Sequence, residues 1–136
     1  MAIKEAPGSL RIDEAVASGQ TAMDESRFEE AANHLRSALR LGSRSSDEEA
    51  QIRCVLSVAL EKRGLNPEQL EAVSKYEKPT DFARLSAAHR MSVLIRLGWG
   101  YCFNNDIPRS IALFNQGLDL FNLVVSVPRS SRDSGK

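Results

Sequence analysis

The stretch LGWGYCFNNDIPRSIALFNQGL, residues 97–118, decides the fold of this 136-residue chain. Two glycines, Gly98 and Gly100, flank a tryptophan inside an apolar run. The turn-like sequence NND follows, and a second apolar run then begins. Asp106 followed by Pro108 is typical of a helix start. The stretch therefore predicts two helices that meet at a tight corner, with the glycines as points of close packing.

A phosphate-binding loop is the alternative explanation for the two glycines. Such a loop follows a strand and leads into a helix N-terminus, often with a GK[ST] sequence. In this chain the glycines follow a helical pattern, and no GK[ST] sequence is present. We therefore favour two packed helices over a phosphate site.

The rest of the chain also shows helical patterns, with hardly any of the alternation that is typical of strands. Helix breakers such as Gly42, Gly64 and Pro79 separate the patterns. Six helices are predicted, at about residues 10–25, 27–41, 47–63, 67–76, 81–103 and 107–125. Short links join antiparallel neighbours, so the predicted fold class is all-α, a stack of antiparallel helical hairpins.

Composition is that of an ordinary globular protein with a neutral charge balance. Hydrophobic residues make up 42%, and Lys+Arg and Asp+Glu both number 18. A neutral balance argues against nonspecific nucleic-acid binding, which needs a basic excess. The apolar runs are too short to span a membrane. Cys54 and Cys102 lie in apolar helical patterns, so we expect reduced, buried thiols and a cytoplasmic protein.

One domain is expected for a chain of this length. We predict a flexible N-terminus over residues 1–8 and a helical domain over residues 9–125. Residues 126–136 are rich in serine and charge, so we expect a disordered tail there.

An internal repeat relates residues 97–118 to the N-terminal part of the chain. Small residues and large apolar residues both recur 79 positions later. The pairs of small residues are Gly19 and Gly98, Ala31 and Ser110, and Ala38 and Gly117. The pairs of large residues are Phe28 and Ile107, Leu35 and Phe114, Leu39 and Leu118, and Leu41 and Leu120. Small residues at fixed places let two helices approach closely, and the large ones fill the space beside them.

On these residues the chain resembles the tetratricopeptide repeat family, whose unit of about 34 residues is a helical hairpin. The last unit fits the family pattern at Leu97, Gly98, Tyr101, Ser110, Phe114, Gly117 and Leu118. The first unit fits at Gly19, Ala22, Phe28, Ala31, Leu35, Ala38 and Leu39. The middle unit is degenerate, because Gln69 stands where the family has a small residue. The resemblance implies a short solenoid of two good repeats around one degenerate repeat.

This resemblance implies a non-catalytic adaptor that binds a helix or extended segment of another protein in a concave groove. The groove residues that it implies most directly are Gln20, Met23, Arg96, Trp99 and Phe103. Further implied positions are Asp13, Val16, Ala17, Cys54, Val58, Glu61, Lys62, Ser92 and Ile95. The family's clamp for C-terminal carboxylates uses Lys and Asn at positions that hold Val16 and Gln20 here, which disfavours that mode. For Trp99, packing against the degenerate middle unit is the alternative.

No catalytic residue, cofactor or metal site is predicted. His34 and His89 are the only histidines, and each stands alone on a predicted helix. Carboxylates such as those of residues 47–49 lie at a helix start, where they favour the helix dipole. We therefore expect no enzyme, and neither a nucleic acid nor a membrane as partner.

The last predicted helix is apolar around most of its circumference, with Arg109, Gln116 and Asp119 as its main polar strip. Such a helix is normally covered on more than one side. We expect it to contact a second copy, a partner subunit or a further C-terminal segment, unless the chain end folds back over it. The predicted assembly residues are Leu113, Phe114, Leu120, Phe121 and Val124. Alternatives to the adaptor are thus a scaffold subunit that dimerises through this helix and a regulatory domain cut from a larger protein.

Overall fold

The computed structural model describes residues 7–134, and the side chains of residues 11–123. Within this range the chain forms seven α-helices, one 3₁₀ helix and no strand. The helices are α1 (Pro7–Asp24), α2 (Phe28–Leu41), α3 (Ser46–Lys62), α4 (Asn66–Val73), η2 (Ser74–Glu77), α5 (Pro79–Ala83), α6 (Ala87–Phe103) and α7 (Ile107–Ser134). The predicted all-α class is confirmed.

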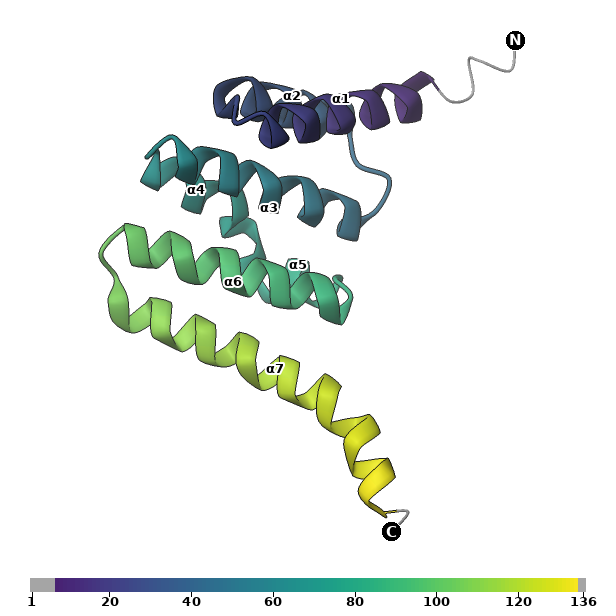
Figure 1. Cartoon of the computed structure of the whole chain (residues 1–136), viewed down its shortest axis with the longest axis vertical. Coiled ribbons are helices and arrows are strands. Elements are labelled where there is room, and N and C mark those ends of the chain that lie inside the picture. Colours follow the sequence, from purple (N-terminus) through teal and green to yellow (C-terminus); the bar gives the residue numbers. More distant parts are fainter. Residues whose placement is uncertain (1–6, 135–136) are drawn as a thin grey trace.

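The helices stack in chain order, from the purple N-terminal hairpin to the yellow end of α7 (Figure 1). Three hairpins make up the stack: α1 with α2, α3 with α4, and α6 with α7. Helix α3 packs on α2, and α6 packs on α3 and α4. One core cluster lies between α1, α2 and α3, and a second joins α3, α4 and α6. The predicted solenoid of helical hairpins is therefore confirmed.

Small residues lie where the helices of each hairpin touch. Ala31 and Ala38 of α2 are fully buried, and Gly19 of α1 lies against the side chain of Leu35. In the last hairpin Ser110 is 3% exposed, and Gly117 is also buried. The repeat read from the sequence therefore marks equivalent contact points in the two hairpins.

Residues 97–118 fold as the end of α6, a tight corner and the start of α7. Asn105 adopts a φ of 68°, and the carboxylate of Asp106 accepts a hydrogen bond from the Arg109 backbone N–H at 3.3 Å, which caps α7. The two glycines of α6 lie against different neighbours. Gly98 faces Phe114 of α7, whereas Gly100 faces Leu70 of α4. Close packing, as predicted, explains both glycines.

The predicted long helix over residues 81–103 is wrong, because the chain leaves the helical conformation between α5 and α6. Ser86 is extended, with φ −66° and ψ 162°, and its backbone N–H donates to Asp47 Oδ1 at 3.0 Å. Leu85 is 3% exposed and belongs to the second core cluster. Burial of Leu85 and the bond to α3 are tertiary contacts, and such contacts override local helix propensity.

The end of α7 also differs from the sequence prediction. The helix continues to Ser134, beyond residue 125 and into the segment predicted to be disordered. It bends in its last part (Figure 1), which contains Pro128. A proline inside a helix lacks one backbone donor and is a common cause of a bend. At the other end α1 begins at Pro7, inside the segment predicted to be flexible; residues 1–6 and 135–136 lie outside the described range.

Candidate protein-binding groove

One face of the stack is built from the first helix of each hairpin, α1, α3 and α6. It carries two adjoining hollows of about 530 and 260 Å³. The larger hollow is lined by Asp13, Val16, Ala17, Arg44, Asp47, Glu48, Gln51, Ile52 and His89. The smaller is lined by Gln51, Cys54, Val55, Val58, Ser92, Ile95 and Arg96. Both hollows are lined by Gln51, so they adjoin each other, and together we call them the inner groove.

Charged residues gather at the end of the inner groove where α3 begins. Arg44 pairs with Asp13 at 2.6 Å and with Glu48, and so ties α1 to the start of α3. Hydrogen bonds from Arg44 hold the pKa of Glu48 below its usual value. The backbone N–H of Ser86 similarly lowers the pKa of Asp47, whose Oδ2 lies 3.6 Å from His89 Nδ1. Three carboxylates and one guanidinium line this end beside His89, so it carries an acidic excess when His89 is neutral.

Apolar side chains line the section of the groove between α3 and α6. Val55 and Val58 come from α3, and Ile95 of α6 is 45% exposed. Cys54 also lines this section, and burial raises the pKa of its thiol to about 11. A thiol with that pKa is almost entirely protonated at neutral pH and is a poor nucleophile. The section therefore suits contact with apolar groups rather than covalent chemistry.

Trp99 and Phe103 continue the apolar surface along α6. They are 41% and 40% exposed. The Trp99 ring centroid lies 5.9 Å from that of Phe103 and 5.3 Å from that of Phe114, the latter in an edge-on arrangement. The aromatic partners of Trp99 thus lie on α6 and α7. This placement leaves much of the indole open to a partner.

Arg96 lines the smaller hollow, but its charge is paired inside the chain. Its side chain is 13% exposed, and its Nη2 lies 2.6 Å from Glu61 Oε1. It also donates to Ser57 Oγ at 3.2 Å and to the fully buried Gln69 at 3.3 Å. The guanidinium therefore joins α6 to α3 and α4 inside the chain. It also explains Gln69, which departs from the family pattern because it accepts a hydrogen bond from Arg96.

The predicted groove residues of α1 lie apart from the aromatic ones. Gln20 is exposed and donates to Asp24 at 3.1 Å. Met23 is half-buried and packs against the first core cluster. Neither residue, nor Trp99 or Phe103, lines the two hollows. The five predicted residues thus do not meet at one point.

Several further positions implied by the resemblance do line the inner groove. Asp13, Val16 and Ala17 line the larger hollow, and Cys54, Val58, Ser92 and Ile95 line the smaller one. The lining residues that sequence reasoning missed are Arg44, Asp47, Glu48, Gln51, Ile52, Val55 and His89. Most of these lie on or beside α3, where the degenerate middle unit hides the repeat register. The one sequence signal for this section of the groove was the three-residue spacing of Val55 and Val58, which places both on one face of a helix.

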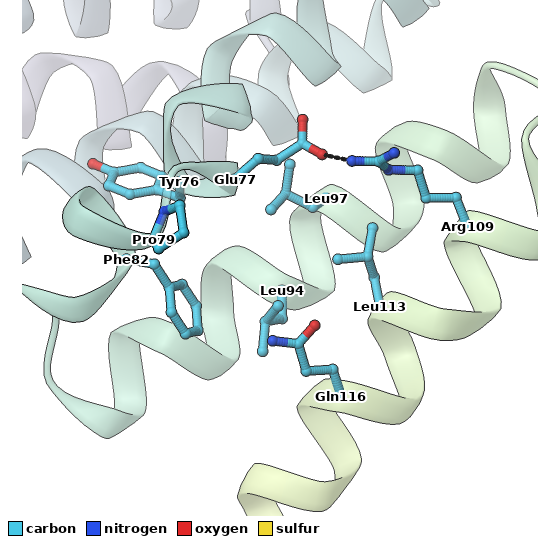
Figure 2. Close-up of a pocket in the computed structure, with 9 residues that line it drawn as sticks. All are labelled: Tyr76, Glu77, Pro79, Phe82, Leu94, Leu97, Arg109, Leu113 and Gln116. Atoms are coloured by element: carbon cyan, nitrogen blue, oxygen red, sulfur yellow. Dashed lines mark hydrogen bonds and ion pairs between the residues drawn. The ribbon is translucent and has the colours of Figure 1, made fainter.

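A second pocket, of about 320 Å³, lies on another part of the surface, between η2, α5, α6 and α7 (Figure 2). Phe82, Leu94 and Leu113 point toward it from three helices (Figure 2). At its edge Glu77 pairs with Arg109, and the Tyr101 hydroxyl donates to Glu77 at 2.8 Å. Apolar walls and one neutralised ion pair give this pocket no group poised for chemistry.

The predicted assembly residues of α7 divide between two sides of the helix. Leu113 packs against the second core cluster, Phe114 lies against Gly98, and Leu120 is half-buried. Phe121 is 49% exposed. Val124 falls outside the residues whose side chains are described. Leu113 is thus half-buried against its own core and lines the second pocket, whereas Phe121 is open to solvent, and the assembly role of these residues stays a prediction.

Two further properties concern only the described part of the chain. Over that part, no three His, Cys, Asp or Glu side chains come together in a way that could hold a metal ion. None of its helices combines the length and the apolar character that crossing a membrane requires.

Comparison with known proteins identifies the fold. The sequence matches no family model and no curated protein. Among solved structures, the chain is similar to the TPR2AB domain of yeast Sti1, determined in complex with pHSP90, with a TM-score of 0.67 and 16% identity. The match covers 94% of this chain and 50% of that one, so the chain spans about half the length of the structure it matches. The fold of this chain is thus tetratricopeptide-repeat-like.

Proposed function

We propose that this protein is an adaptor that binds a helix or an extended segment of another protein along the inner groove. The observation that carries the proposal is the open apolar strip of Val55, Val58 and Ile95 beside the exposed Trp99. Aromatic and aliphatic anchors of this kind supply most of the binding energy in protein interfaces. The TPR2AB domain of yeast Sti1, whose structure includes pHSP90, supports a protein partner at this general level.

Charge suggests the chemistry of the partner segment. Asp13, Asp47 and Glu48 outnumber Arg44 at one end of the groove, so a basic residue of the partner is favoured there. The apolar strip favours aliphatic or aromatic side chains next to it. Val16 lines the groove and Gln20 lies on the same helix, in place of the Lys and Asn of the family's carboxylate clamp. The partner is therefore held by an internal segment rather than by a C-terminal carboxylate.

The adaptor is non-catalytic and cytoplasmic in this proposal. Its fold is one that serves protein interaction rather than catalysis. Cys54 and Cys102 are both free thiols, in keeping with a reducing compartment.

Affinity capture with matched variants tests the proposal. The immobilised full chain is incubated with lysate of its own source cells, and bound proteins are identified by mass spectrometry. Ile95→Arg and Val58→Arg should lose the specific partner, and Trp99→Ala should bind it more weakly. Ala112→Arg is the control, because Ala112 is an exposed residue of α7 that lines neither hollow. Capture of the same proteins by the Ile95 and Val58 variants would exclude the inner groove as the binding site.

A scaffold subunit that assembles through its last helix is the second candidate. The exposed apolar residues of α7 favour it.

A further inference from the structure

Large exposed hydrophobic side chains are confined to one part of the described chain. Every large hydrophobic residue that is at least 40% exposed lies on α6 or α7. On α7, Ile107, Ile111, Leu118 and Phe121 are between 48% and 54% exposed. Ordinary scatter of surface hydrophobics would not place them all in the last hairpin. A localised patch of this kind indicates an interface.

These residues follow the spacing of a coiled-coil seam. Ile107, Ile111, Phe114, Leu118 and Phe121 are separated by four, three, four and three residues. Alternation of threes and fours places side chains along one stripe of a helix, where a second helix can lie. None of the five carries a charge. We call this stripe the α7 seam.

In the first hairpin of the same chain, the equivalent stripe on α2 is covered by another helix. Counting back 79 residues from Ile107, Ile111, Phe114 and Leu118 gives Phe28, Ala32, Leu35 and Leu39 of α2. There, Ala32 is fully buried and Leu35 is 1% exposed, because α3 lies along them. In the last hairpin Ile111 and Leu118 occupy the equivalent places and are 54% exposed. The α7 seam is therefore shaped for an α-helix with an apolar face.

We propose that this helix is α7 of a second copy of the chain, so that two α7 seams pack together in a symmetric dimer. The occupant must be a helix with an apolar, uncharged stripe, and α7 itself has that stripe. Because the seam carries no charge, two copies meet without repulsion. Closed two-fold dimers are the commonest assemblies of identical chains.

The exposed area is of the right size for such a dimer. Ile107, Ile111, Leu118 and Phe121 are each about half exposed. Taking roughly 150–250 Å² for a large side chain, the range of aromatic residues, these four expose on the order of 300–500 Å². A standard interface buries about 800 Å² on each partner, and only about 55–65% of it is apolar. The exposed seam residues thus provide most of the apolar area, and the polar residues around them provide the rest.

Sedimentation velocity on the full chain between about 1 and 100 µM, where interfaces of this size associate, tests the dimer. The parent should have twice the mass of one chain. Leu118→Glu and Ile111→Glu should raise the dimer dissociation constant at least about 100-fold, because each buries two unpaired carboxylates. Both residues are exposed in the single chain, so the circular dichroism melting curve of the monomer should be unchanged.

Ala112→Glu is the matched control, because it adds the same charge to an exposed position of α7 outside the seam. It should remain dimeric. A parent that is monomeric across this range overturns the proposal, as does a Leu118→Glu variant that stays dimeric. Capture of another protein's helix by a monomeric parent would equally assign the seam to a different occupant. Loss of the dimer by the Ala112 control would show that the seam is not the interface.

Discussion

A Cβ atom added to Gly98 would lie 2.6 Å from Cε1 of Phe114. Helices α6 and α7 therefore approach each other at a point where no side chain fits without movement of the aromatic ring. The same ring also contacts Trp99 edge-on, with 5.3 Å between the ring centroids. In the first hairpin, a Cβ on Gly19 would lie 3.0 Å from the side chain of Leu35. The two good repeats thus share one contact, a glycine of the first helix against a large residue of the second.

Gly98→Leu should strongly destabilise the protein, because the new side chain would wedge α6 away from α7. Overpacking of this kind typically costs about 1–3 kcal/mol. Gly117→Ala is the control, since its Cβ would meet Leu94 at an ordinary 3.6 Å and alanine favours a helix. Chemical denaturation should show a much lower free energy of unfolding for Gly98→Leu and an undiminished one for Gly117→Ala. Equal stability of the two variants would contradict the close-packing role of Gly98.

Arg96→Ala should destabilise the fold, since it leaves the buried carbonyl of Gln69 without its donor. An unpaired buried acceptor costs about 1–3 kcal/mol. Replacing both partners, with Arg96→Met and Gln69→Leu together, should recover the part of this loss that comes from Gln69, because its carbonyl is then no longer left without a donor. Denaturant titrations of Arg96→Met, Gln69→Leu and the double variant measure the coupling free energy between the two side chains. Strictly additive losses would show that the two side chains do not depend on each other.

Cys54 and Cys102 should differ in reactivity. Burial raises the pKa of Cys54 to about 11, so at pH 8 only about one thousandth of it is thiolate. Cys102 is partly exposed. An aromatic disulfide reagent such as DTNB should modify one thiol per native chain quickly, and the second only when the chain unfolds. Two thiols reacting in a single fast phase would contradict the burial of Cys54.

Stability should fall in acid partly through Asp47. The Ser86 backbone N–H lowers the pKa of this carboxyl. A depressed folded-state pKa means that the stabilisation is complete above the unfolded value of about 4 and is lost as the pH falls below it. Thermal melts from pH 6 to pH 3 should therefore show a shallower acid loss for Asp47→Asn than for the parent. Parallel pH profiles would show that Asp47 contributes nothing to the acid response.

Much of the fold was predictable from the sequence because its causes are local. Helical spacing, helix breakers and the Asp106 cap act over a few residues, so the all-α class and the corner before α7 followed from them. The repeat of small residues at a displacement of 79 identified the close contacts, including Gly98. Where a helix is broken by distant contacts, as at Ser86, local pattern predicts continuity and is wrong.

The candidate site was only partly predictable. Groove positions such as Val16 and Ile95 followed from the family resemblance, because the good repeats carry a clear register. Arg96 was predicted as a groove residue, but nothing near it in the chain reveals Glu61 or Gln69 as its partners. Those residues meet only when α3, α4 and α6 pack together.

The sequence by itself determined that α7 is apolar on most sides. Which side faces solvent was decided only by the tertiary structure. Contacts of Gly98 with Phe114 and of Gly117 with Leu94 set the rotation of α7 about its own axis. That rotation turns Leu113 toward the core and leaves Leu118 half exposed. Apolar character is a property of each residue, whereas the exposure of a side chain depends on how close two helix axes come and where they touch.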